Sequence, residues 1–209
     1  MKRKVRHLSL FLLSLVASLA SCDSHQDFPE TGIRPGQVLC EDGHIRTLDA
    51  MRSAGHKAVA VVFHANNNPD IEGHGYAVFL HELVPYALSD SLGITQGTSC
   101  SITAMDGNAN THALYNTKDC SSPAAEKVFD MWACGQSAYI PSVAQMRLLY
   151  ENRTVVNKSI EACGGDILPV SPDTYNCWYW TSTEVDGMQD SKAWLYSLES
   201  GARQETPKI

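Results

Sequence analysis

Apolar and polar positions along the chain predict strands near both ends and helices in between. Residues 37–48 carry apolar runs on either side of Asp42-Gly43, a dipeptide that is typical of a hairpin turn. Residues 57–65, KAVAVVFHA, form an apolar run rich in β-branched side chains, and residues 74–84, HGYAVFLHELV, alternate between apolar and polar. We predict a hairpin followed by two core strands that pair with each other.

A polar region and then a helical segment follow. Residues 85–122 are rich in Ser, Thr, Asn, Asp and Gly, and within them residues 100–105, CSITAM, have the pattern of a short strand. Residues 122–135 predict a helix with Pro123 in its first turn and Gly135 as its C-cap. The middle of the chain is therefore predicted to be irregular first and helical afterwards.

The next helix has the clearest local signal in the chain. Ser142 and Gln145 have the spacing of a capping box, in which each side chain bonds the other residue's backbone N–H. The apolar face continues through three residues at helical spacing: Met146, Leu149 and Tyr150. A second, short helix is predicted to end at Cys163-Gly164-Gly165.

The last part of the chain predicts strands again. Residues 178–183, WYWTST, and 192–198, KAWLYSL, are strand-like, and a turn at 199–201 leads to ARQETP at 202–207. Strands come first, helices in the middle and strands last. This order indicates an α+β fold with antiparallel sheets and two to three helices.

Three tryptophans lie on these strands. They indicate either strands that are buried in the core or an exposed binding edge. Because side chains alternate across a strand, we predict Trp178 and Trp180 on one face and Tyr179 on the other. Trp194 is the expected partner of one of these tryptophans across the sheet. Large aromatic side chains on a strand face usually pack against a helix, so we predict a core role. An exposed platform that stacks on a sugar is the alternative.

The N-terminus has the pattern of a bacterial lipoprotein signal. Four basic residues stand at its start: Lys2, Arg3, Lys4 and Arg6. The apolar run at 8–19 is too short for a bilayer core of about 30 Å and fits a secretory signal. It ends in Leu-Ala-Ser-Cys, which resembles a lipobox. We predict a signal peptide at 1–21, acyl chains on Cys22 that anchor the protein to a membrane, and a tether at 22–36.

The net charge of the mature chain disfavours some classes of binding partner. Loss of residues 1–21 removes four of 16 basic residues and none of 23 acidic ones, which leaves a net charge of −11. Nucleic acid is a poor partner for such a surface, because phosphates bind clustered Lys and Arg. The 44% apolar content is sufficient for a packed domain.

Cysteine usage permits disulfides. Six cysteines follow Cys22: Cys40, Cys100, Cys120, Cys134, Cys163 and Cys177. An even number in an exported chain permits up to three bridges, and no Cys-x-x-Cys spacing indicates a metal cluster. A bridge between Cys100 and Cys120, which flank a polar loop, is the most natural pairing, with the others competing.

Motifs within residues 138–208 resemble a known family. AYIPSVAQMRLLYENR, YWTSTEVDG, KAWLYSLESG and ETPK are similar to the Lcl C-terminal-type domain, a C-type-lectin-like module. The front half, with GQVLCEDGHI, AVAVVFHANNN and GYAVFLHEL, resembles the N-terminal part of lipoproteins from gut Bacteroidales. The resemblance implies a C-type-lectin-like part at 123–209, packed as one unit with a β-rich part at 37–122. It also implies an adhesin-like or surface-binding role, by fold-level analogy.

One feature departs from that family. Such domains continue beyond the Pro-Lys pair into a closing strand with a Val-Arg-Pro motif, whereas this sequence ends at Ile209. We therefore expect the closing strand to be absent and a sheet edge to be exposed.

Three carboxylates form a candidate ligand site. Glu184, Asp186 and Asp190 follow the tryptophan-rich strand, and carboxylates in an irregular loop can hold Ca²⁺ through about six to eight oxygens. No Asp-x-Asp-x-Asp-Gly loop accompanies them, so a solvated turn is the favoured interpretation. No cofactor is predicted, with calcium as the possible exception.

Three histidines form a candidate metal site. His64, His74 and His81 lie on the two predicted core strands and would converge if the strands pair. Histidines at strand ends are more often hydrogen-bonded singly. The pair His81-Glu82 starts like a zinc-protease helix, but position 85 is Pro instead of the second His.

These features predict a lipid-anchored protein of the outer membrane or cell surface that binds a glycan or a protein. The polar region 85–122 and the loop 184–191 are the predicted binding surfaces, because loops on a rigid scaffold carry function. An exported enzyme with a His- or Cys-based centre is one alternative. A structural component of a fimbria-like assembly is the other.

Overall fold

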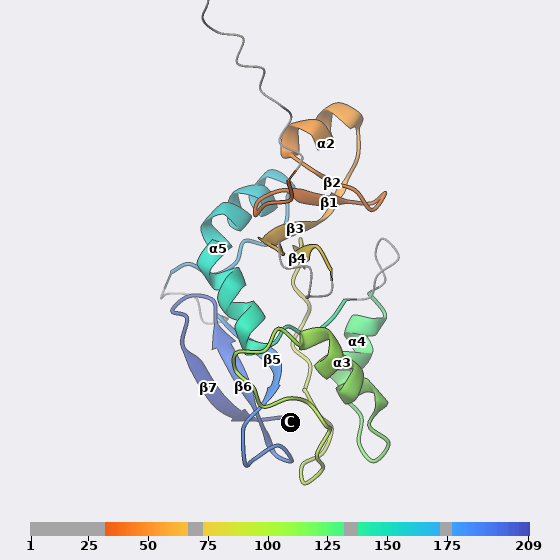
Figure 1. Cartoon of the computed structure of the whole chain (residues 1–209), viewed down its shortest axis with the longest axis vertical. Helices are drawn as coiled ribbons and strands as arrows, with labels where there is room; N and C mark the ends of the chain where they lie inside the picture. The colour runs from red at the N-terminus through yellow and green to blue at the C-terminus, as the bar shows by residue number, and fades with distance from the viewer. Residues whose placement is uncertain (1–31, 67–72, 132–137, 172–176) are drawn as a thin grey trace, which may run out of the picture. The chain divides into compact units, whose positions relative to one another are not determined.

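The computed structural model describes residues 32–66, 73–131, 138–171 and 177–209. Residues 33–209 form one compact unit. Within the described residues the chain folds into four helices and two antiparallel sheets (Figure 1). The α+β class with antiparallel sheets is therefore confirmed. None of the described helices is long and apolar enough to cross a membrane.

The first sheet consists of four short strands: β1 Val38–Cys40, β2 Ile45–Arg46, β3 Ala58–Ala65 and β4 Gly75–Phe79. Their spatial order is β2-β1-β3-β4. The predicted hairpin is confirmed, because β1 and β2 pair antiparallel across Asp42-Gly43. Asp42 also binds the Arg46 guanidinium through two hydrogen bonds of 2.7 Å, which ties the turn to β2.

The two predicted core strands pair as expected, with Val61 opposite Val78. β4 is shorter than the predicted strand at 74–84. The chain leaves the sheet after Phe79, and the backbone oxygen of Leu80 accepts a hydrogen bond from the Asp166 N–H. Contact with a distant segment therefore ends the strand before its alternating pattern ends.

Two helices lie in the part that was predicted to be β-rich. α2, Leu48–Ala54, begins at the N-cap Thr47 and ends at Gly55 in the left-handed conformation. α3, Gly107–Asn116, follows a segment at 100–105 that has no strand. The predicted strand CSITAM is therefore wrong.

The predicted helix at 122–135 is present as α4, Pro123–Phe129. Ser122 caps it by accepting a hydrogen bond from the Ala125 N–H, and Pro123 occupies the first turn as predicted. The expected C-cap Gly135 lies outside the described residues.

Helix α5, Val143–Ala162, is one continuous helix of 20 residues, and it ends at the C-cap Cys163, where a second, short helix was expected to end. Both hydrogen bonds of the capping box between Ser142 and Gln145 are present. The predicted apolar face is confirmed: Met146 and Leu149 are buried, and Tyr150 packs against the same core.

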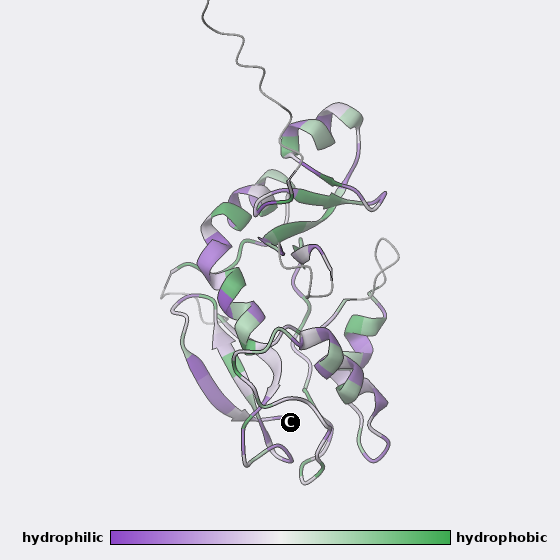
Figure 2. Ribbon diagram, in the orientation of Figure 1, coloured by the Kyte–Doolittle hydropathy of each residue, from purple (hydrophilic) through white to green (hydrophobic). Residues whose placement is uncertain are grey.

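The second sheet follows α5: β5 Trp178–Glu184, β6 Lys192–Ser197 and β7 Arg203–Pro207, in that spatial order. All neighbours are antiparallel. In Figure 2, β1 and β3 are largely hydrophobic, whereas β7 is hydrophilic. This agrees with the exposure of Arg203, Gln204 and Glu205 in β7, at the edge of the second sheet.

Helix α5 joins the two sheets into one core. It contacts β3 of the first sheet and β5 and β6 of the second. The main core therefore contains residues from both sheets, among them Val61, Phe63, Met146 and Tyr196. A smaller core forms around Leu88, Leu114 and Ala125, where α3 and α4 meet.

Candidate functional site

The first sheet borders a cavity of about 430 Å³. Most of the side chains that line it are apolar or aromatic: Leu39, Ile45, Ala60, Val62, Tyr76, Ala77, Phe79, Tyr139 and Met146. The cavity has the size and lining of small-molecule and side-chain binding pockets, which are mostly apolar with few polar groups.

Strand β3 is apolar on both of its faces and contributes side chains from both to the cavity lining. Val61 and Phe63 belong to the main core beside α5. Ala60 and Val62 alternate with them along the strand and line the cavity at 3% and 2% exposure, together with Phe63 from the main core.

The strand register completes this apolar face. Leu39 of β1 and Phe79 of β4 pair with Ala60 from its two sides, and Ala77 pairs with Val62. Ile45 on β2 is 37% exposed, and Ala77 is exposed as well. The face is therefore accessible at its rim and buried at its centre.

Aromatic rings form another part of the lining. The Tyr76 ring stacks on Phe63, with centroids 5.9 Å apart, and meets Tyr139 edge-on at 6.4 Å. The Tyr139 hydroxyl accepts a hydrogen bond of 3.4 Å from the side-chain amide of Gln145. The pKa of Tyr139 is raised far above its usual range. Burial is the larger cause, and the neighbouring Tyr76 is the smaller one. Tyr139 therefore presents a neutral phenol to the cavity.

The predicted carboxylate site is not assembled as a calcium site. Asp186 and Asp190 are exposed, but Glu184 at the end of β5 is fully buried. Its carboxylate forms an ion pair of 2.9 Å with Lys208, which is fully buried too. The interpretation of all three as a solvated turn is therefore wrong for Glu184, because a lysine 24 positions later covers and neutralises it.

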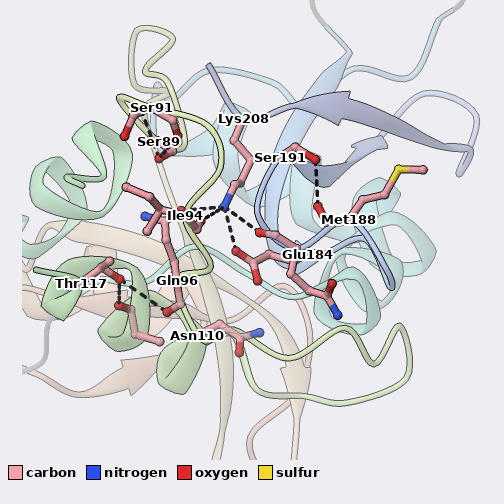
Figure 3. Close-up of polar contacts among 12 residues, drawn as sticks. Ser89, Ser91, Ile94, Gln96, Asn110, Thr117, Glu184, Met188, Ser191 and Lys208 are labelled. Atoms are coloured by element: carbon pink, nitrogen blue, oxygen red, sulfur yellow. Dashed lines mark hydrogen bonds and ion pairs between the residues drawn. The ribbon is translucent and has the colours of Figure 1, made fainter. Parts of the chain in front are cut away.

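Lys208 is the centre of a buried polar cluster (Figure 3). Besides Glu184, its ammonium donates to the side-chain oxygen of Gln96 and the backbone oxygen of Gln189, both at 2.9 Å, and to the Ile94 backbone oxygen at 3.5 Å. The cluster thus fastens the residue after β7 to the loop at 94–96. Burying such a charge is costly unless it is paired in this way.

The three tryptophans do not share one core. Trp180 packs against the smaller core and donates its indole N–H to the Tyr86 backbone oxygen. Trp194 packs against the main core, and its cross-strand neighbour is Glu205, not a tryptophan. Trp178 is 38% exposed. The core prediction therefore fails for Trp178, which pairs with Ser197 at the outer end of the sheet.

The three histidines do not converge. His64 stacks on Tyr76, His74 is exposed at the cavity, and His81 contacts Asp166 at 3.3 Å. The whole of β4 separates His74 from His81. No group of three or more metal-ligating side chains occurs in the part of the chain that the structure describes.

The cysteines in the described residues do not form the predicted disulfide. Cys100 and Cys120 are not bridged, so the predicted pairing is wrong. Burial raises the pKa of the Cys100 and Cys163 thiols, which keeps them protonated and weakly nucleophilic. Cys22 and Cys134 lie outside the described residues.

The cavity and the lysine cluster were both missed by sequence reasoning. The run KAVAVVFHA contained a signal for the cavity, because a strand with a continuous apolar stretch at 58–63 needs cover on both faces. Nothing adjacent in sequence pointed to the pairing of Lys208 with Glu184. No protein family, curated protein or solved structure matches the chain, so the site itself is the basis for a functional proposal.

Proposed function

We propose that this chain is a lipid-anchored surface protein that binds a protein ligand through the cavity of the first sheet. An apolar side chain of the ligand enters between Ala60, Val62 and Phe79. The observation that carries the proposal is the apolar cavity that these residues line, whose rim is exposed at Ile45 and Ala77. Accessible apolar cavities rimmed by polar residues mark binding sites on soluble domains.

The membrane anchor in this proposal is supported by the sequence around Cys22, where an apolar run ends in Leu-Ala-Ser-Cys. Acyl chains there attach the compact unit to the outer membrane or cell surface through residues 22–36. The motifs in residues 138–208 support a C-type-lectin-like fold for the C-terminal part, as a more specific form of the α+β class.

A protein ligand suits the cavity better than a sugar. Sugar hydroxyls in an apolar pocket lose their hydrogen bonds to water without replacement, which costs free energy. Glycan binding is the second candidate because of a different observation, the exposed indole of Trp178. An exposed indole on a strand can stack on the face of a sugar ring.

The enzyme alternative has less support. The three histidines contact different partners, and burial raises the pKa of the Cys100 and Cys163 thiols, which disfavours their nucleophilic thiolate forms. A role in a fimbria-like assembly is a special case of protein binding, in which the ligand is another subunit.

The test uses residues 23–209 as a soluble protein against a displayed random-peptide library and a glycan array. Ala77→Trp fills the rim of the cavity, and Ala109→Trp, at an exposed position of α3, is the matched control. Enrichment of peptides with apolar residues that Ala77→Trp abolishes and Ala109→Trp retains supports the proposal.

Other outcomes separate the candidates. Glycan binding that is lost in Trp178→Ala and kept in Ala77→Trp favours the sugar candidate. Peptide binding that Ala77→Trp leaves intact excludes the cavity as the site.

A further inference from the structure

Lys208, Gln96 and Glu184 form a buried triad of amine, carboxamide and carboxylate. The Lys208 nitrogen lies 2.9 Å from the side-chain oxygen of Gln96 and 2.9 Å from one carboxylate oxygen of Glu184. Lys208 and Glu184 are 0% exposed and Gln96 is 4% exposed. In Figure 3 the amino group of Lys208 points between the loop that carries Gln96 and the end of β5 that carries Glu184.

Two atoms of this triad have no hydrogen-bond partner among the described residues. They are the second carboxylate oxygen of Glu184 and the amide nitrogen of Gln96. Buried polar atoms without partners are rare and each needs a physical reason. These atoms are the free oxygen of a base and the nitrogen of a potential leaving group.

We propose that Lys208 and Gln96 become joined by an intramolecular amide bond, and that Glu184 is the base that promotes its formation. The Lys208 ammonium first transfers a proton to Glu184. The resulting amine attacks the carboxamide carbon of Gln96, and its nitrogen forms a new C–N bond while the carbonyl electron pair moves to oxygen.

Collapse of this adduct expels the original amide nitrogen. Glu184 delivers the first proton to that nitrogen and accepts a second proton from the Lys208 nitrogen. The products are the Lys208–Gln96 amide, ammonia and a neutral Glu184 acid. All atoms balance, nothing is oxidised or reduced, and no other reactant is required.

The fold favours this reaction in two ways. The amine and the carboxamide are held in contact before reaction, which replaces a bimolecular encounter by a positioned one. The reaction also replaces two buried charges by a neutral amide and a neutral acid, and buried charges are expensive in a dry interior. The bond fastens the residue after β7 to the loop before α3, and it is independent of the cavity and of any ligand bound there.

The test is peptide mapping of the full chain by mass spectrometry after reduction and complete tryptic digestion. Trypsin cleaves after Lys57, Lys118 and Arg203, so the bond predicts a branched peptide that joins residues 58–118 to 204–209. Its mass is lower than the sum of the two parts by one ammonia. Recovery of the two peptides unjoined, with cleavage after Lys208, overturns the proposal and leaves a structural ion pair.

Variants separate the roles of the groups. Glu184→Gln preserves the shape of the side chain and removes the base, so the branched peptide is expected to disappear. Lys192→Arg, which changes the solvent-accessible ion pair with Glu205, is the control and keeps it. A branch to residues 159–192 with loss of one water assigns the bond to Glu184 instead and overturns the role of Gln96. A branched peptide that persists in Glu184→Gln overturns the role of the base.

Discussion

Gly107 donates its backbone N–H to the side-chain oxygen of Gln145 across a distance of 3.2 Å. The same oxygen accepts the Ser142 N–H at 2.9 Å in the capping box of α5. The first residue of α3 therefore lies directly on the first turn of α5. A Cβ atom at position 107 would overlap both this oxygen and the backbone oxygen of Ile140, so the contact requires glycine.

Gly107→Ala is expected to destabilise the protein by about 1–3 kcal/mol, because overpacking a close contact forces the backbone apart. The alanine would otherwise favour the helix, so the sign of the effect distinguishes the contact from helix propensity. Urea denaturation measures the free energy of unfolding. Asn108→Ala, at the next and exposed position, should shift it by less than about 0.5 kcal/mol. A Gly107→Ala variant more stable than the wild type contradicts the prediction.

In protein in which Lys208 is not joined to Gln96, Lys208→Met leaves the Glu184 carboxylate buried without its cation, and it is expected to lower the free energy of unfolding by about 3–5 kcal/mol. The double variant Lys208→Met with Glu184→Leu removes both charges and should recover much of this loss. Denaturant titrations of the wild type, the two single variants and the double variant provide the coupling between the residues. Additive effects would show that the pair is not coupled.

The raised pKa of Tyr139 predicts that the folded protein loses stability at alkaline pH. Its pKa is raised in the folded state, so the folded protein holds the phenol proton more tightly than the unfolded chain does. The resulting stabilisation is complete below the ordinary tyrosine pKa of about 10 and declines as the pH rises beyond it. In Tyr139→Phe the free energy of unfolding should fall less steeply over this range. Tyr115→Phe, at a half-exposed position, is the control, and equal slopes in wild type and Tyr139→Phe would contradict the prediction.

The cavity predicts binding of a small apolar probe. Anilinonaphthalene sulfonate should gain fluorescence with the native protein, because the apolar cavity has an exposed rim at Ile45 and Ala77. Ala77→Trp should remove the signal and Ala109→Trp should retain it. A signal that both variants retain would place the dye elsewhere.

Lipid attachment is tested separately from binding. Cells that express the full chain and are fed an alkyne-modified fatty acid should label the protein, and Cys22→Ala should abolish the label and release the protein from the membrane fraction. Cys177→Ala is the control, since that cysteine is buried beside Ser197. Labelling that persists in Cys22→Ala would refute acylation at this position.

Several sequence patterns that depend on residues close in the chain were confirmed. The hairpin at Asp42-Gly43, the capping box from Ser142 to Gln145 and the strands on both sides of the turn at 199–201 all formed as predicted. Each depends on local backbone preferences or on hydrogen bonds across three or four residues.

Predictions from local sequence patterns failed where contacts with distant segments override the helix propensity of the residues. α3 contains Gly, Asn and Thr, which are weak helix formers, yet Leu114 and Thr111 are fully buried against other segments. The hydroxyl of Thr111 donates to the Gly107 oxygen and accepts the Ile140 N–H. Tertiary packing therefore makes a helix from a sequence that alone does not predict one.

The pattern of apolar and polar residues was enough to predict the α+β order of elements and the apolar character of β3, and the motif at Cys22 indicated the candidate anchor. Long-range packing makes Glu184 a buried ion-pair partner instead of a surface ligand, leaves Trp178 exposed and forms the cavity beside β3. The physical reason is that strand and cap preferences depend on near neighbours. Burial of a charge or an aromatic ring depends on which distant segment covers it, and only the folded chain brings Lys208 to Glu184.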